Sequence, residues 1–257
     1  MDAEIQARAR EINRCNQRGG RMLTLLDLMA AGTMTRDMAA FSLAAIGAGA
    51  SFMVGARPGG AGKTTVMGAL LNLVPPDIEL AAAEDERVIE DGLRGVQRRR
   101  CYVCHEIGAG PYYAYLWGRA LRRYFELPAA GHLLATNLHA DTYAQARGQV
   151  CGENRVPPAA FRRLNLIYFL ACDGTAWNAR RRIVALWESD GAEAHRPIHG
   201  EGAAEPLPRA TRLVSAGRFE AALATLDALA ASGAGTIEAV GAFLARRRRA
   251  VAQGDPA

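Results

Sequence analysis

Residues 50–74 read ASFMVGARPGGAGKTTVMGALLNLV, in which a glycine-rich turn separates two apolar segments. The first segment is short enough for a strand, and the second, which follows Lys63 and Thr64, has apolar residues at helical spacing. Glycines allow backbone N–H groups to turn inward around an anion, and the N-terminus of a helix adds positive potential at the same place. The stretch therefore predicts a strand, a phosphate-binding loop and a helix, which is typical of a nucleoside-triphosphate site.

The basic and hydroxyl residues of this loop fit the same chemistry. In such loops a lysine reaches the β and γ phosphates, and a serine or threonine hydroxyl binds Mg²⁺. Lys63 is the only lysine in the chain, which suggests that this position needs a compact ammonium group rather than a guanidinium. The pattern G-x-x-x-x-G-K-[ST] is incomplete, because Arg57 stands at the position of its first glycine. The alternative is a glycine-rich turn that contains GKT by chance, and the flanking strand and helix patterns argue against it.

The composition is that of a folded protein, since half of the residues are hydrophobic. The net charge of +5 permits contact with nucleic acid or an anionic membrane but does not require it. The positive excess is concentrated in arginine clusters at 98–100, 180–182 and 246–249. Such runs are usually solvated helix faces or strand ends, so we do not expect nucleic acid as a partner.

Cysteine usage and hydropathy bear on the compartment. The five cysteines, at 15, 101, 104, 151 and 172, lack the spacing of a disulfide framework, and no signal peptide is recognised. We therefore expect reduced thiols and a cytoplasmic protein. Residues 38–56 carry no charge and are long enough to span a bilayer, but they are rich in Ala, Gly and Ser. We interpret them as a buried helix followed by a buried strand and predict no transmembrane segment.

Strand-like and helix-like segments alternate along the chain. Strands are expected at 51–54, 78–83, 101–107 and 132–138, followed by a final pair at 164–172 and 182–187. Helices are expected at 2–17, 22–31, 36–47 and 112–127, from 63 to the prolines at 75–76, and from about 141, while 88–96 is ambiguous. This alternation predicts an α/β fold with a mostly parallel sheet covered by helices on both faces.

Composition also suggests boundaries between parts of the chain. Residues 190–208 are rich in Gly, Ala, Glu and Pro, which is typical of a linker. We therefore expect an N-terminal helix and linker at 1–20, a core at 21–189, the linker at 190–208 and a small helical C-terminal region at 209–257.

Acidic and histidine residues follow several of the predicted strands. Glu84 and Asp85 follow the strand at 78–83, Glu106 lies near the end of CYVCHEI, and His139 follows HLLATNL. In an α/β sheet the carboxyl ends of strands lie beside the phosphate loop, where a carboxylate can orient a water molecule or accept its proton. Each residue taken singly could belong to a surface turn or be a structural histidine. Their arrangement around one loop favours a functional interpretation.

The motif C-x-x-C-H at Cys101, Cys104 and His105 matches the spacing of c-type haem attachment. In a strand, side chains alternate between the two faces, so the two thiols would point to opposite sides. Covalent haem attachment also normally accompanies export. We therefore favour two cysteines buried in a strand over a haem site or a metal site.

With these motifs in place, the chain resembles the secretion ATPases of the type II/type IV superfamily, the motors of pili and secretion systems. It is most similar to the branch that serves conjugation and Tad-type pili. The likeness covers the ATPase core only, from about Leu23 to Leu186. LLDLMAAGTMTRDMAAF resembles the lead-in of the family, GAGKTTVMGALLNLVPP its Walker A motif and helix, and AEDE its acidic box. VCHEI is similar to its degenerate Walker B motif, GHLLATNLHAD to its histidine box, and LNLIYFLACDG with RRRIVALWE to its closing strands.

This resemblance implies a RecA-like P-loop NTPase core with a small helical C-terminal appendage, which binds ATP and Mg²⁺ and hydrolyses ATP. It implies Glu106 as the hydrolytic carboxylate, Glu84 as an assisting acid and His139 as a sensor of the γ-phosphate. Thr64 would bind Mg²⁺, and the phosphates would be bound by Gly59, Gly60, Ala61, Gly62, Lys63, Thr64 and Thr65. The resemblance also implies a homo-oligomeric ring, a hexamer, with an arginine that reaches the neighbour's phosphates. A protein of the inner membrane or of the secretion system would be its partner and would bring it to the membrane.

Departures from the family pattern keep alternatives open. Arg57 replaces a loop glycine, His105 stands where the family has glycine, and Ile107 follows Glu106 where an arginine is usual. Arg57 and His105 favour a nucleotide-binding regulatory or adaptor protein with little hydrolysis. A P-loop small-molecule kinase is a second alternative, which would need an acceptor pocket and a mobile lid that the sequence does not show. A haem protein is the third.

Overall fold

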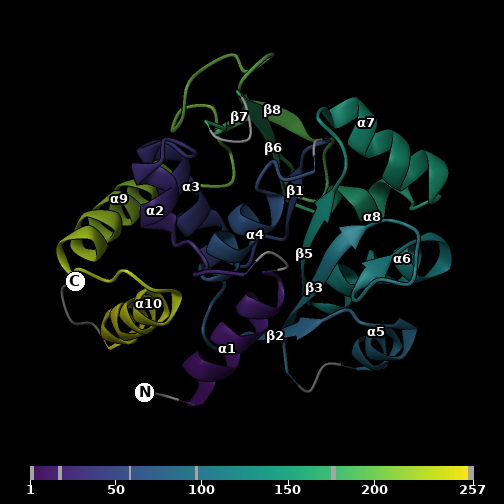
Figure 1. The fold of residues 1–257 in the computed structure, drawn as a ribbon, viewed down its shortest axis with the longest axis horizontal. Helices are drawn as coiled ribbons and strands as arrows, with labels where there is room; N and C mark the ends of the chain where they lie inside the picture. The colour runs from purple at the N-terminus through teal and green to yellow at the C-terminus, as the bar shows by residue number, and fades with distance from the viewer. Residues whose placement is uncertain (1–2, 17–18, 58, 96–97, 175–177, 254–257) are drawn as a thin grey trace.

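One mixed sheet organises the computed structural model, which describes residues 3–16, 19–57, 59–95, 98–174 and 178–253 (Figure 1). Among these residues the strand order is β2-β3-β5-β1-β6-β7-β8, and β4 pairs with β3 outside this path. Pairing is parallel from β2 through β6, including β4, and antiparallel between β6, β7 and β8. The predicted α/β fold with a mostly parallel sheet is therefore confirmed. The strands are β1 (Phe52–Gly55), β2 (Glu79–Ala82), β3 (Arg100–Ile107), β4 (Tyr115–Leu116), β5 (Leu133–Leu138), β6 (Leu166–Asp173), β7 (Arg180–Glu188) and β8 (Arg196–His199).

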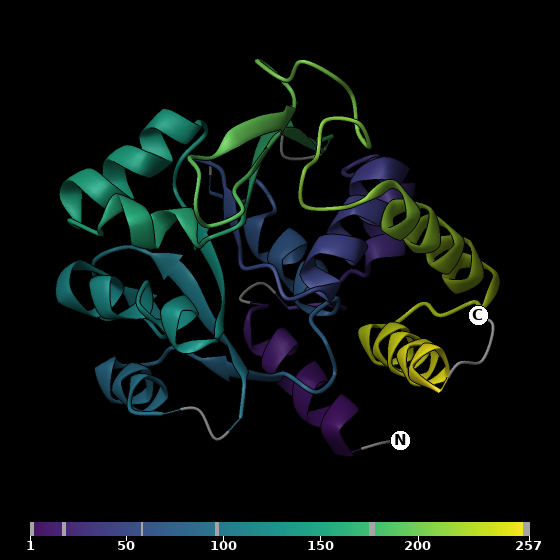
Figure 2. The same cartoon turned by 180° about the vertical axis from the view of Figure 1, so that it is seen from behind.

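Helices cover both faces of the sheet (Figures 1 and 2). The first layer contains α1 (Ala3–Arg14), α2 (Leu25–Ala30), α3 (Arg36–Gly47), α4 (Lys63–Leu71), α9 (Ala216–Ala231) and α10 (Ile237–Ala252). The second layer contains α5 (Glu86–Leu93), α6 (Gly118–Tyr124), α7 (Tyr143–Arg147) and α8 (Pro158–Arg162), with a 3₁₀ turn at Leu127–Ala130 and a π-helical segment at Gly148–Glu153. Alternate residues of β1 pack into different layers, with Phe52 and Val54 in the first and Met53 in the second. Two hydrophobic cores therefore hold this strand, and the loop that follows it, in place.

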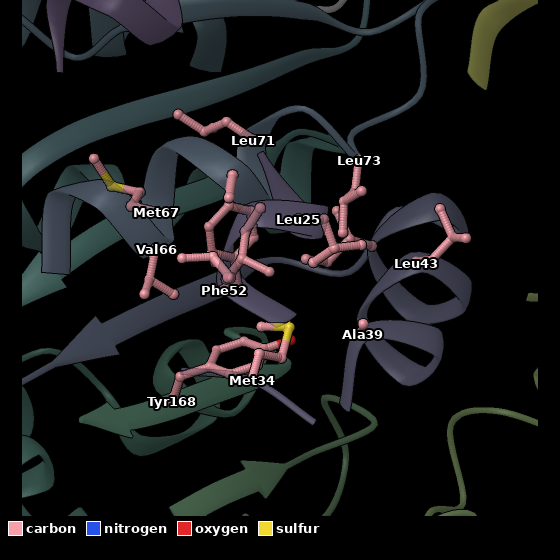
Figure 3. Packing of buried hydrophobic residues seen from close by; sticks show 14 of the residues in the cluster. Leu25, Met34, Ala39, Leu43, Phe52, Val66, Met67, Leu71, Leu73 and Tyr168 are labelled. Carbon is pink, nitrogen blue, oxygen red and sulfur yellow. The ribbon is translucent and has the colours of Figure 1, made fainter. Parts of the chain in front are cut away.

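The C-terminal helices belong to the first layer. Phe219 of α9 and Val240 of α10 are buried in the same hydrophobic cluster as the residues of α3 and α4. Figure 3 shows part of this cluster, in which Phe52 of β1 is surrounded by helix residues such as Leu25 and Val66. The small helical region predicted at 209–257 is therefore joined to the core by shared apolar packing.

The segment expected as a linker, 190–208, is partly ordered into the sheet. Its residues Arg196–His199 form β8, which pairs with β7 in antiparallel register. Composition alone did not reveal this strand, because Pro197 and the surrounding glycines are typical of loops. Proline is tolerated in β8 because this strand lies at the edge of the sheet, where not every backbone N–H must pair.

Several local predictions agree with the structure. Helix α3 begins at Arg36 behind Thr35, whose hydroxyl accepts a hydrogen bond from the backbone N–H of Met38 at 3.2 Å. Residues 38–56 form most of α3 and then β1, as expected of a buried helix and strand. In the described part of the chain, no helix combines the length and the apolar character needed to cross a bilayer.

Other local predictions were wrong in extent. The helix expected at 112–127 begins only at Gly118, because Tyr115–Leu116 form β4 beside β3 and Ala114 has a φ of 53° that an α-helix does not allow. Helix α4 ends at Leu71, ahead of the prolines at 75–76. The ambiguous segment at 88–96 contributes to α5, which begins earlier, at Glu86.

Candidate nucleotide-binding site

The loop between β1 and α4 has the backbone geometry of an anion-binding turn. Gly60 and Gly62 have φ values of 86° and 96°, a region in which glycine is strongly favoured. Gly62 is the N-cap of α4. Because glycine has no side chain that could cap the helix, the first N–H groups of α4 remain available to a ligand. Gly55 is required just before the loop, because a Cβ there would lie 2.7 Å from the carbonyl oxygen of Ala140.

Arg57 causes no backbone strain where the loop pattern has its first glycine. It does not have a positive φ, so a side chain is tolerated at this position. Its backbone N–H donates a hydrogen bond to Oδ1 of Asp141 at 2.6 Å, and its carbonyl lies 3.0 Å from Nδ1 of His139. The departure from the pattern is therefore compatible with the loop conformation, and the segment after β5 holds the backbone of the loop at Arg57.

Lys63 is buried at the start of α4 and its ammonium group is surrounded by possible partners. Its side chain is 8% exposed, and Nζ lies 3.2 Å from the carbonyl oxygen of Ala56 and 3.5 Å from Oε2 of Glu106. Burial lowers the pKa of Lys63, and the negative charge of Glu106 opposes that shift. The lysine is thus held over the loop by groups that a bound phosphate could replace.

Glu106 reaches this position through a bulge in β3. Cys104 is paired with Thr136 and Ile107 with Leu138, so two residues of β3 face the single residue Asn137 of β5. The side-chain Nδ2 of Asn137 donates to the carbonyl oxygen of His105 at 2.9 Å and stabilises this irregular turn of the backbone. Bulges change the direction of side chains and are frequent beside active sites. Here the bulge directs the Glu106 carboxylate toward the loop.

The environment of the Glu106 carboxylate is unusual for an ionised group. Burial raises its pKa, while Lys63 and then His139 act in the opposite direction. Oε2 faces Lys63, whereas Oε1 is buried and has no hydrogen-bond partner among the described residues. An unpaired buried carboxylate oxygen is costly, so this atom is suited to a water molecule or to a ligand of the site.

His139 connects the loop to Glu106 from the end of β5. Its Nδ1 lies 3.0 Å from the carbonyl oxygen of Arg57 and 3.2 Å from Nζ of Lys63, so the role of each ring nitrogen depends on the tautomer. Nε2 lies 3.5 Å from Nζ of Lys63 and 3.7 Å from Oε2 of Glu106. The side chain is about half exposed, at 51%, so it can respond to a ligand that enters the site.

The other predicted acids lie elsewhere. Glu84 is 48% exposed, accepts a hydrogen bond from the Tyr113 hydroxyl at 2.6 Å and is not among the residues that line the cavity. Asp85 is the N-cap of α5 and accepts hydrogen bonds from the N–H groups of Arg87 and Val88. The structure therefore brings together Lys63, Glu106 and His139, but not the acidic pair after β2.

A cavity of about 470 Å³ opens beside the loop. It is lined by all of the predicted phosphate-binding residues, together with Glu106 and His139. It is also lined by residues that the sequence analysis did not single out for the site, namely Asn16, Met22, Leu23, Leu28, Ala31, Thr33, Val66, Tyr115, Leu170, Ala179, Arg180 and Arg181. Asp141, which anchors the loop at Arg57, was also missed as a site residue. These residues come from segments far apart in sequence, so no local pattern could have grouped them.

The donor set fits Mg²⁺ bound together with a nucleotide. Thr64 lines the cavity with a hydroxyl, and Glu106 supplies an unpaired carboxylate oxygen, both of which are hard oxygen ligands. Within the described residues, no cluster of three or more His, Cys, Asp or Glu could hold a metal ion. Mg²⁺ normally keeps several waters and binds through substrate phosphates with one or two protein oxygens, which is the arrangement these residues allow.

The cysteines of the C-x-x-C-H motif are separated by the sheet. Cys101 belongs to the hydrophobic cluster of the first layer and Cys104 to that of the second. Burial raises the pKa of both thiols to about 12. The His105 side chain lies beside a different thiol, since its Nε2 is 3.5 Å from Sγ of Cys15. The alternation predicted for this strand is confirmed, and these side chains do not converge on one ligand position.

Solved structures that the chain resembles include three ATPases, one of which comes from a type IV secretion system. The VirB11 ATPase of Brucella suis, in complex with sulphate, has a TM-score of 0.45 and 21% identity over 64% of this chain and 54% of its own. The DotB ATPase of Legionella pneumophila has a TM-score of 0.42 and 10% identity over 91% of this chain and 59% of its own. The DotB ATPase of Yersinia pseudotuberculosis has a TM-score of 0.45 and 10% identity over 88% of this chain and 63% of its own.

The chain spans 54% to 63% of the length of these three structures. No family model and no curated protein matches it.

Proposed function

We propose that the chain binds ATP with Mg²⁺ in this cavity and hydrolyses it, as a P-loop ATPase of the secretion type. The observation that carries the proposal is the convergence of Lys63, Glu106 and His139 on the uncapped N-terminus of α4. A buried ammonium group, a buried carboxylate with a free oxygen and a glycine loop are the parts that phosphoryl transfer to water requires.

Each group has a distinct role in this proposal. The backbone N–H groups from Gly59 to Thr65 and the Lys63 ammonium would bind the phosphates, and the phosphates would compete with Glu106 for the lysine. Mg²⁺, when bound at the Thr64 hydroxyl, supplies positive charge that neutralises the phosphate oxygens. Glu106 would orient a water molecule and accept its proton as the water oxygen bonds to the γ-phosphorus and the bond to ADP breaks. His139 would sense the γ-phosphate through its contacts with Lys63 and the Arg57 carbonyl.

The proposal is tested by measuring nucleotide binding and turnover separately. Lys63→Ala should abolish ATP binding in a calorimetric titration with Mg²⁺. Glu106→Gln should retain binding and lose turnover, because an amide cannot accept the proton. Circular dichroism of both variants verifies the fold. Wild-type protein that binds no ATP contradicts the proposal as a whole.

A nucleotide-binding regulator with little hydrolysis is the second candidate. It is favoured by one observation, which is that Glu84 lies outside the cavity and leaves Glu106 as the carboxylate that reaches the loop. The two candidates differ in turnover alone. If wild-type protein binds ATP but releases phosphate no faster than Glu106→Gln, the regulator is the correct function.

Assembly and location follow from the sequence resemblance. We propose a homo-oligomeric ring, a hexamer, in the cytoplasm, with a partner in the inner membrane or secretion apparatus. Light scattering coupled to size-exclusion chromatography, with and without Mg·ATP, tests the ring. A strict monomer under both conditions contradicts it.

A further inference from the structure

Arg181, on β7, packs directly against the phosphate loop although it is far from the loop in sequence. Its Nε donates a hydrogen bond to the carbonyl oxygen of Gly60 at 3.1 Å. Its Cδ lies 3.0 Å from the place that a Cβ on Gly62 would occupy. The side chain is half-buried and lines the cavity. The guanidinium is therefore held beside the turn that would receive the phosphates.

The charge of this guanidinium is not neutralised by a carboxylate of the described chain. No acidic side chain in the described ranges lies within ion-pair distance of Arg181, and no atom in those ranges accepts a hydrogen bond from its Nη1 or Nη2. The next residue differs, because Arg182 is paired with Asp173 at 2.6 Å and does not line the cavity. A fixed guanidinium with two free nitrogens is a strong donor to phosphate oxygens.

We propose that Arg181 contacts a phosphate of the bound nucleotide and is supplied by the same chain as the loop. Nε would continue to hold the Gly60 carbonyl, while Nη1 and Nη2 donate to the phosphate. The ligand class is a nucleoside polyphosphate or inorganic polyphosphate, because the contact recognises charge and not the base. This inference rests on the proposed function and adds a residue to that site.

The test uses Arg181→Gln in the full chain. The amide nitrogen of glutamine stands as many bonds from Cα as Nε of arginine, so it can keep the hydrogen bond to Gly60 while the charge and both terminal nitrogens are lost. We expect affinity for ATP and for tripolyphosphate, measured by titration calorimetry, to fall about tenfold or more. The matched control is Arg182→Gln, which removes the same charge from the adjacent residue and should change affinity less than twofold.

A role limited to positioning the loop gives a different result. In that case Arg181→Gln would retain affinity for both ligands within twofold, and this outcome overturns the proposal. Arg181→Lys keeps the charge and should recover part of the lost affinity; a lysine variant as weak as the glutamine variant also overturns it. If Lys63→Ala abolishes binding while Arg181→Gln has no effect, the proposed function stands and the inference fails. If the wild type binds neither ATP nor tripolyphosphate, both fail.

Discussion

The ends of β2 and β3 lie side by side in the sheet and each presents an acid, but their surroundings differ. At the end of β3 the Glu106 side chain is 8% exposed and faces Lys63. At the end of β2 the Glu84 side chain is 48% exposed and is bound to Tyr113, with Arg14 at 3.9 Å. β3 is separated from β1 only by β5, whereas β2 lies one strand further away and at the edge of the described sheet.

The comparison shows that a position after a strand does not suffice to place an acid in the site. The strand must lie near the loop, and the backbone must aim the side chain toward it. β3 meets both conditions, because the bulge opposite Asn137 changes the direction of its last residues. We therefore expect the two acids to contribute unequally.

The largest effect is expected from Glu106→Gln. The substitution keeps the shape of the side chain but removes the proton acceptor, so steady-state ATP turnover should fall at least about 100-fold. Binding of ATP, measured by titration calorimetry, should be retained. Glu84→Gln is the matched control, and an equal loss of turnover in that variant would contradict the distinction between the two acids.

A pH profile tests the role of Glu106 by a second route. Burial raises the pKa of Glu106 above its ordinary value of 4.5, and the group acts in its ionised form. Activity that depends on it should therefore be lost as pH falls through this raised pKa, at a pH above 4.5. The measurement is kcat/KM against pH, which reports groups of the free protein. A profile that stays flat down to pH 4.5, in protein that circular dichroism shows to be folded, would contradict the assignment.

The bulge itself can be weakened with Asn137→Ala. This change leaves the buried carbonyl of His105 without its side-chain donor, so we expect a loss of stability of about 1–3 kcal/mol in urea unfolding. Turnover should fall more than ATP affinity, because the orientation of Glu106 is affected and the loop is not. Asn72→Ala is the control, since Asn72 is also buried and donates to the carbonyl of Ile237, away from the site. Equal losses of turnover in the two variants would show that the bulge has no special role.

The smallest effects are expected at the end of β2. Tyr113→Phe removes the hydrogen bond to the exposed Glu84 carboxylate, and the resulting change in unfolding free energy should be about 0.5 kcal/mol or less. ATP turnover should change less than about threefold, because neither residue lines the cavity. A large loss of turnover would restore Glu84 as an assisting acid.

Much of this architecture could be predicted from local patterns, because they reflect local physics. The apolar run of β1, the glycine loop and the first residues of α4 are adjacent in sequence, and their conformations follow from residue type. The cap of α3 by Thr35 has the same origin. The helix predicted at 112–127 was wrong in extent, because Tyr115–Leu116 pair with β3 and this pairing overrides the helical periodicity of the sequence.

The candidate site shows the same division between local and tertiary information. The sequence by itself determined the strand-loop-helix unit, the single lysine and the acids that follow the strands. Only the tertiary structure decided that Glu106 enters the site and Glu84 does not, since this depends on strand order and on a bulge formed against Asn137. It also decided that Arg181 lies on the loop, because β7 reaches that place by pairing with β6, the neighbour of β1. Such contacts join segments that are distant in sequence, and no local periodicity encodes them.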